Sequence, residues 1–285
     1  MALSCKKKLK HLGSDMEKRF DLHCHSIFSD GSDTPQELLQ LAVKRGLAGL
    51  SITDHDTTEA YVPALFDSAK KLGLRLLCGV EISTEYYAVN IHVLGYGFDL
   101  ESPDLKKALS SIRESRRRRN LQILEKLAKK GMPIDPLELY PESQTVRIKG
   151  RPHIAALMIA KGYVSTMQEA FAGYLDDNAS CYVTGMKYST QLAIEVLHKA
   201  GGKAILAHPG QIRKQEIVKN LLKMPFDGLE GYYSVLPPAR ERKWQRIARL
   251  KNWIIAGGSD YHGAVRPFVQ LGCSYVSEEV FNAFF

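Results

Sequence analysis

The sequence predicts an α/β protein in which a βα barrel is interrupted by one helical insertion. Short apolar runs alternate with amphipathic stretches up to about residue 100 and again after about residue 185, the rhythm of parallel strands joined by crossover helices. Between these parts the rhythm stops, and residues 103–130 form one long helical pattern. Histidines and carboxylates also gather where the apolar runs end. We therefore expect a barrel whose polar groups meet at one face.

The first part of the barrel begins with the run “FDLHCH”. Alternate side chains of a strand point to opposite faces, so His23 and His25 share one face. A helix is expected to start at Pro35, with Thr34 as its cap and Glu37 at the capping-box position. The elements that follow are the strand “LAGLSITDHD”, a helix over residues 58–72 and the strand “RLLCGVEIS”.

The second part of the barrel repeats this pattern. We expect helices over residues 190–200, 214–223 and 238–250, and strands at “KAILAH”, “GLEGYY” and “WIIAGGSD”. Shorter helices at 154–161 and 166–174 complete the insertion. The expected organisation is a polar tail at residues 1–15, a catalytic barrel at 16–100 and 186–285, and a helical insertion subdomain at 101–185.

Composition excludes several classes of protein. The 285 residues are 45% hydrophobic and 25% charged, which is ordinary for a globular enzyme. No apolar run could span a bilayer, and residues 1–20 lack the apolar core of a secretory signal. Five scattered cysteines without a Cys-x-x-Cys pair indicate a reducing compartment, so a cytoplasmic location is expected. The net charge of +8 indicates an anionic partner, either a phosphate ester or a nucleic acid.

Residues that can bind metal ions fall at the ends of different strands. The carboxyl ends of all strands of a βα barrel meet at one face, so these side chains should converge. The set is His23, His25, Asp30, His55, Glu81, His92, His208, Asp260 and His262, with His153 reaching the same mouth from the insertion. A lone strand histidine is more often a hydrogen-bonded core residue. Core packing does not explain two histidines on one strand face together with the clustering of the others.

This ligand chemistry indicates a catalytic site with several metal ions. Imidazole and carboxylate without thiolate suit Mn²⁺, Zn²⁺ or Fe, and Mg²⁺ less well. The candidates exceed the four ligands of a structural zinc ion. Such a site ionises a bound water near neutral pH, so a metal-bound hydroxide would be the nucleophile. It also binds the attacking and the leaving oxygen of a phosphoryl displacement. The chain contains neither a serine elbow nor a Walker loop.

Together these blocks resemble the PHP-domain phosphoesterases, the superfamily named for polymerase and histidinol phosphatase. From Phe20 onward the family's blocks occur in order as “DLHCHSIFSDG”, “SITDHDT”, “GVEIS” with “IHVLGY”, “GRPHIA”, “LAHPG” and “GGSDYHG”. The resemblance implies a distorted (βα)7-type PHP barrel. It also implies three divalent metal ions, with Mn²⁺ expected and Fe or Zn as alternatives.

The resemblance assigns ligands to each ion. It implies a first ion held by His23, His25, Glu81 and Asp260, a second held by Glu81, His92 and His153, and a third held by Asp30, His55 and His262. His208 and Arg151 match positions suited to phosphate contact or general acid catalysis. His208 could instead be a ligand.

Within the superfamily, the length, the insertion and “GRPHIA” are most similar to the bacterial 3′,5′-nucleoside bisphosphate phosphatases. That group includes RNase AM, a 5′→3′ exoribonuclease that acts on short RNA and on ribosomal RNA precursors. The implied substrate is a 5′-phosphorylated nucleotide such as pAp, or short RNA, cleaved at the 3′-phosphoryl bond. One alternative is a small-metabolite phosphatase such as histidinol-phosphate phosphatase. Another is a non-catalytic PHP module that stabilises a polymerase-type partner, a role that usually goes with lost ligands. We expect no membrane partner and no obligate protein partner.

The run “RESRRRRN” lies inside the long predicted helix. A charge run of this kind is more often a solvated face than a binding site. Four consecutive arginines span a full turn, however, so at least one points toward whatever the insertion covers. Arg116 and Arg119 are the candidates for substrate contact through a 5′-phosphate. Tyr232 and Tyr233 are either stacking residues for RNA or core residues of a strand.

Overall fold

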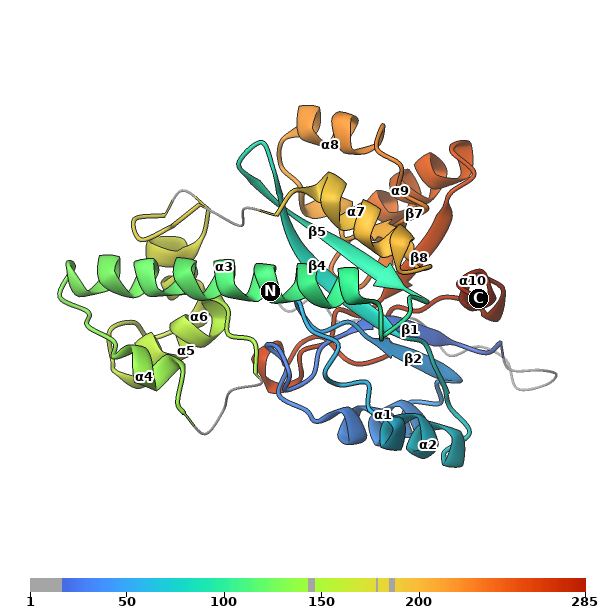
Figure 1. Ribbon diagram of the computed structural model, residues 1–285, viewed down its shortest axis with the longest axis horizontal. Helices are drawn as coiled ribbons and strands as arrows, with labels where there is room; N and C mark the ends of the chain where they lie inside the picture. Colours follow the sequence, from blue (N-terminus) through green and yellow to red (C-terminus); the bar gives the residue numbers. More distant parts are fainter. Residues whose placement is uncertain (1–16, 143–146, 178, 185–187) are drawn as a thin grey trace.

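The computed structural model describes residues 17–142, 147–177, 179–184 and 188–285 (Figure 1). The expected tail at residues 1–15 and the expected boundary between residues 185 and 186 lie outside these ranges. Within them the α/β prediction is confirmed, because the strands form two sheets with helices packed around both. No described helix combines the length and apolar character needed to cross a membrane.

The first sheet is parallel and has the strand order β1-β2-β3. Its elements are β1 (Phe20–Cys24), α1 (Pro35–Lys44), β2 (Gly49–Ile52), α2 (Pro63–Lys71) and β3 (Arg75–Leu76). Helix α1 starts where predicted, because Thr34 and Glu37 form a reciprocal capping box. Helix α2 starts at Pro63 instead of residue 58. The residues before it form a turn that carries Tyr61 into the core.

The second sheet has the order β4-β5-β6-β7-β8. Its strands are β4 (Gly79–Tyr86), β5 (Val89–Tyr96), β6 (Lys203–Leu206), β7 (Gly228–Tyr233) and β8 (Ile254–Gly258). Only β6, β7 and β8 are parallel, whereas β4 and β5 form an antiparallel hairpin and β5 pairs antiparallel with β6. Tyr87 and Ala88 both adopt left-handed backbone conformations in the hairpin turn, which tight two-residue turns require. The parallel rhythm read from the sequence therefore fails at this hairpin.

The expected single strand “RLLCGVEIS” is divided between the two sheets as β3 and β4. The buried hydroxyl of Tyr61 bridges the break. It accepts from the N–H groups of Ile52 and Gly79 and lies 2.9 Å from the carbonyl oxygen of Leu77. These main-chain groups are satisfied by a side chain, so the strand can leave one sheet and enter the other.

The remaining elements of the second part are α7 (Thr190–Lys199), η2 (Pro209–Gln211), α8 (Gln215–Leu221), α9 (Pro238–Leu250), η3 (Gly263–Val265) and α10 (Glu278–Asn282). The two sheets meet where their strands end. The N–H of Asp260 donates to the carbonyl of His23 at 2.7 Å, and isolated bridges join Cys24 to Tyr261 and His55 to Glu81. The described strands thus form two sheets joined at their ends, without one continuous ladder that closes a barrel.

The middle of the chain is helical, as predicted. Its elements are α3 (Pro103–Ala128), α4 (Pro136–Leu139), α5 (Arg151–Ala160), α6 (Met167–Ala170) and a π-helical turn η1 (Phe171–Leu175). The first half of α3 packs Leu109 and Ile112 into the core of the second sheet. Its second half packs Ile123 and Leu127 against Ile154 of α5 in a separate cluster. Figure 1 shows α4, α5 and α6 gathered along the end of α3 that extends away from the sheets.

Candidate metal centre

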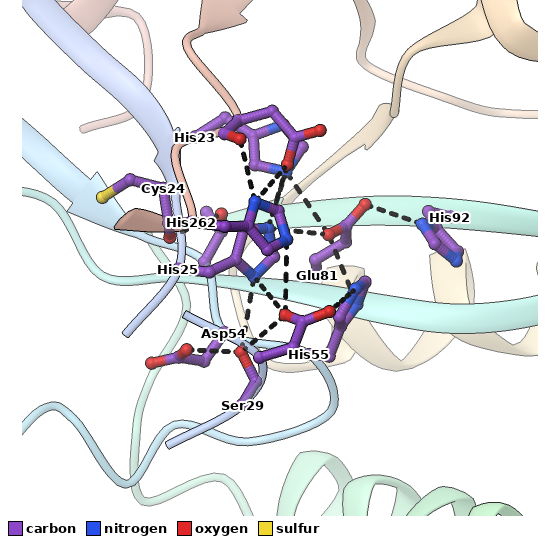
Figure 2. Close-up of polar contacts among 12 residues, drawn as sticks. His23, Cys24, His25, Ser29, Asp54, His55, Glu81, His92 and His262 are labelled. Carbon is purple, nitrogen blue, oxygen red and sulfur yellow. Dashed lines mark hydrogen bonds and ion pairs between the residues drawn. The ribbon is translucent and has the colours of Figure 1, made fainter. Parts of the chain in front are cut away.

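The core of the site is a triangle of ligand atoms from His23 of β1, His25 directly after β1, and Glu81 of β4 (Figure 2). The Nε2 atoms of His23 and His25 are 3.2 Å apart, and Glu81 Oε2 lies 3.3 Å from the first and 3.2 Å from the second. All three side chains are buried. His23 ends on the same side as His25 because they are two residues apart, as the strand pattern predicted.

This triangle fits a divalent ion. Ligands bonded at about 2.0–2.1 Å in a tetrahedral arrangement lie about 3.3–3.4 Å from one another, and these are the bond lengths of imidazole and carboxylate to zinc-like ions. The separations between the three atoms, 3.2 to 3.3 Å, therefore leave room for one ion bonded to all of them. The donor set of imidazole and carboxylate suits Mn²⁺, Fe or Zn²⁺ equally.

Asp260, after β8, joins the same two histidines. Its Oδ1 lies 3.4 Å from His23 Nε2 and 3.3 Å from His25 Nε2. Its other oxygen accepts from the hydroxyl of Tyr233 at 2.7 Å and from the guanidinium of Arg266 at 2.5 Å. These two donors fix the carboxylate so that Oδ1 faces the histidines.

A second group surrounds the other oxygen of Glu81. Oε1 lies 2.8 Å from His92 Nδ1 and 2.9 Å from His208 Nε2, and these two nitrogens are 3.3 Å apart. His55 Nδ1 approaches Oε2 at 3.3 Å, so His55, Glu81 and His92 can also share an ion. Glu81 is thus the carboxylate common to two groups.

A third group lies beside the first and contains His25, Asp30, His55 and His262. Asp30 Oδ1 is 3.4 Å from His262 Nε2, and Asp30 Oδ2 is 3.8 Å from His55 Nε2. The loop that carries Asp30 is held by Asp54, which accepts from the hydroxyl of Ser26 at 2.5 Å and from that of Ser29 at 2.6 Å.

The charges of these groups depend on one another. Burial disfavours charge on His25, but hydrogen bonds to Asp260 and Glu81 raise its pKa to about 10. Burial likewise opposes ionisation of Glu81, yet the neighbouring histidines, His55 foremost, hold its pKa well below the usual range. The carboxylates are therefore ionised and gather positive charge around them. A metal ion would replace protons in this role.

Glu230 is a site residue that sequence reasoning missed. Its side chain is fully buried in β7, with Oε1 2.9 Å from His23 Nδ1 and Oε2 accepting the N–H of His208 at 2.8 Å. Because a carboxylate only accepts, it orients His23 with Nε2 toward Glu81. A glutamate inside the strand “GLEGYY” is the signal that could have identified it, since buried acids need a partner.

His153 lies apart from the three groups of possible ligands. Its Nδ1 accepts the N–H of Gly150 at 3.0 Å at the start of α5, and its Nε2 is buried without a hydrogen-bond partner among the described residues. Burial lowers the pKa of His153 to about 4, so the ring is neutral, and because Nδ1 accepts, the single ring proton is on Nε2.

The candidate arginines are engaged with protein groups. Arg116 Nε and Nη2 donate to Asp56 Oδ2 at 2.9 and 2.5 Å, and this pair is buried. Arg119 is also buried, and Arg151 pairs with Asp177 at 3.2 Å. Of the two tyrosines, Tyr233 is buried and supports Asp260, as described above, whereas Tyr232 packs beside the sheet core.

Similarity to known proteins identifies the family. The PHP-domain family model matches residues 21–130. The chain is 37% identical to a 5'-3' exoribonuclease of Haemophilus influenzae over 254 residues, which are 87% of this chain and 91% of the relative. The chain belongs to the PHP-domain family. This PHP-domain protein is also 32% identical to the 5'-3' exoribonuclease Rnm of Escherichia coli, over 89% of this chain and 88% of that one.

Two further relatives support this placement. The 3',5'-nucleoside bisphosphate phosphatase of Chromobacterium violaceum is 34% identical over 74% of each chain. A solved structure from Bifidobacterium adolescentis, assigned to the metal-dependent phosphoesterases, matches with a TM-score of 0.84 at 30% identity and covers 93% of this chain and 94% of that one. The fold described above is thus that of a PHP-domain phosphoesterase over nearly the whole chain.

Proposed function

We propose that this PHP-domain protein is a metal-dependent phosphoesterase that hydrolyses the 3′-phosphoryl bond of 5′-phosphorylated nucleotides and degrades short RNA in the 5′→3′ direction. The observation that carries the proposal is the set of three adjoining groups of histidines and carboxylates. Each pair of groups has one residue in common, which is Glu81, His25 or His55. Relatives named as exoribonuclease and as bisphosphate phosphatase support the substrate class. We further propose that the two sheets are the halves of a distorted (βα)7-type barrel and that the protein is cytoplasmic.

Three ions fit these groups. We propose that the first is held by His23, His25, Glu81 and Asp260, and the third by Asp30, His55 and His262. For the second, Glu81 and His92 are joined more closely by His208 than by His153, so we propose His208 as the additional ligand. Such ions supply the Lewis acidity that activates water and offsets charge on the phosphoryl oxygens. Mn²⁺ remains the expected ion, with Fe or Zn²⁺ as alternatives.

The residues of the chain itself exclude bulk water from the site and orient the substrate. Burial of His23, His25 and Glu81 keeps bulk water from the ligand atoms, which strengthens electrostatic stabilisation at the site. Arg151 would contact the transferring phosphoryl group only after leaving Asp177, so we propose that substrate competes with that carboxylate. From the insertion, the Nε2–H of His153, which has no partner among the described residues, can donate to a substrate phosphoryl oxygen. His153 could hold an ion only after Nδ1 releases the N–H of Gly150 and takes the ring proton.

The decisive experiment compares hydrolysis of pAp, a 5′-phosphorylated RNA oligonucleotide and histidinol phosphate, each with added Mn²⁺. We expect turnover of the first two and little of the third. His25→Ala should abolish turnover because it removes a ligand shared by two groups. Preferred hydrolysis of histidinol phosphate would favour the small-metabolite alternative. A purified chain without metal and without activity on any ester would favour the non-catalytic module.

A further inference from the structure

A basic pocket of about 520 Å³ lies between α3 and residues 137–142 and 147–149. Its cationic lining residues in the described part of the chain are Arg113, Arg116, Arg117, Arg147 and Lys149, against two glutamates. The two glutamates are Glu114 and Glu142. Arg116 and Glu114 are each paired with a residue that does not line the pocket. Arg116 pairs with Asp56, and Glu114 pairs with Arg118 on the outer face of α3. Arg113, Arg117 and Arg147 alone outnumber the remaining carboxylate, Glu142, so the pocket carries excess positive charge.

Three of the arginines have no carboxylate partner within the described ranges, namely Arg113, Arg117 and Arg147. Arg147 donates to the carbonyls of Ser29 and Gly31 at 3.1 and 2.9 Å, and Arg113 donates to the carbonyl of Asp56 at 3.3 Å. These are neutral acceptors, so the full charge of each guanidinium remains. Each also has further N–H groups that a phosphate could accept from.

The effect of this charge is visible at one lining residue. Burial, together with the charge of Arg147, lowers the pKa of Lys149 to about 8. A bound anion would relieve the repulsion among these cations, which is the behaviour of a phosphate site.

The pocket also offers a surface for a base. The Arg117 guanidinium lies 4.7 Å from the centre of the Tyr140 ring, and Pro141 lines the same side. Leu137, beside them, is 61% exposed. Aromatic rings and guanidinium planes stack on bases of any sequence. Phosphate-binding cations next to a stacking surface indicate a nucleotide unit as ligand.

The position of the pocket indicates which nucleotide of the substrate it binds. Its inner end adjoins the metal centre, because Arg147 holds the residues on either side of Asp30. Its outer end is formed by Arg117 and Leu137, both exposed. A site that begins beside the metal ligands and opens at the surface fits a chain that continues past the cleaved bond.

We propose that the basic pocket binds the nucleotide that follows the cleaved phosphate in an RNA substrate, with the 3′-phosphate of that nucleotide on Arg113, Arg117 and Arg147 and its base on Tyr140. The inference rests on the proposed function. It separates RNA from pAp, because pAp has no nucleotide beyond the cleaved phosphate and cannot fill the pocket.

The test compares kcat/KM on a 5′-phosphorylated RNA tetranucleotide with kcat/KM on pAp. Arg117→Gln and Tyr140→Ala should each lower the RNA value about tenfold, consistent with the loss of one stacking contact. The pAp value should stay within about twofold. Tyr140→Phe keeps the ring and should retain RNA cleavage. Lys106→Gln is the matched control, because Lys106 lies on the same helix, pairs with Glu101 and, like Glu101, is absent from the pocket.

Two kinetic results would overturn the inference. Equal losses on RNA and pAp, with unchanged melting temperatures, would mean that the pocket serves the nucleotide common to both substrates. Unchanged RNA cleavage in both variants would mean that it serves neither. If the wild-type chain cleaves neither substrate, fluorescence anisotropy with a 3′-labelled, 5′-phosphorylated RNA decides separately. Weaker binding by Arg117→Gln than by Lys106→Gln would support the pocket although the proposed function had failed, and equal binding would refute it.

Discussion

In the metal centre, each clustered histidine faces a carboxylate, whereas in the basic pocket three arginines face only main-chain carbonyls or an aromatic ring. Glu81, Asp30 and Asp260 together approach six histidines within 3.8 Å. The pocket, by contrast, leaves Arg113, Arg117 and Arg147 without a carboxylate in the described chain. Buried carboxylates and neutral imidazoles suit a resident cation, whereas guanidinium groups without a carboxylate partner suit a phosphate ligand.

The largest effect should come from the carboxylate shared by the groups of the metal centre. Glu81→Gln removes a charged ligand that contacts His23, His25, His55, His92 and His208. We expect activity to fall roughly a thousandfold, because bound ions supply several kcal/mol of transition-state stabilisation and about 1.4 kcal/mol corresponds to a factor of ten. Elemental analysis should show fewer ions per chain.

The matched control is Glu85→Gln on the same strand, whose side chain lies outside the three ligand groups. It should retain both metal and activity. Equal metal content and activity in Glu81→Gln and wild type would mean that Glu81 is not a metal ligand.

The next effect tests the one pocket arginine that is paired. Arg116→Ala leaves Asp56 buried without its partner, and we expect a loss of about 3–5 kcal/mol in the free energy of unfolding. Asp56→Ala should cost a similar amount, and the double variant less than the sum of both. Chemical denaturation of all four proteins measures this. Additive losses would mean that the two residues do not interact, and Arg116 would then be available to substrate.

A smaller effect is expected where a carboxylate supports the centre without being a proposed ligand. Glu230→Ala should weaken metal binding about 10–100-fold, because His23 loses the partner that orients its ring. Glu230→Gln keeps an oxygen acceptor and should recover most of the affinity. Calorimetric titration with Mn²⁺ measures both, and circular dichroism checks that the fold is intact. Affinity equal to wild type in the alanine variant would assign Glu230 a packing role alone.

The smallest expected effect is a difference between RNA and pAp in how kcat/KM depends on salt concentration. Raising the salt concentration from about 50 to about 200 mM should lower kcat/KM on RNA several-fold more than on pAp, if the pocket neutralises one or two additional phosphates of a single strand. Arg117→Gln should reduce this difference. An identical salt dependence for both substrates would show that no phosphate beyond those of pAp is held by exposed cations.

Much of the fold follows from local pattern. The capping box of Thr34 and Glu37, the long helix from Pro103 and the alternation that puts His23 and His25 on one face were all predicted correctly. These features depend on residues within one or two turns of each other, so sequence neighbours carry the information. The hairpin of β4 and β5 was not predicted, because Tyr87 and Ala88 are not the residues that signal a tight turn.

The sequence by itself determined which residue types stand at the ends of the strands, and hence that imidazoles and carboxylates would meet. Only the tertiary structure decided the partners: His208 beside His92, Arg116 on Asp56, and Glu230 on His23 across 207 residues of sequence. The physical reason is range. Alternation and capping act between neighbours, whereas the distance between two side chains on different strands is set by how the two sheets pack at their ends.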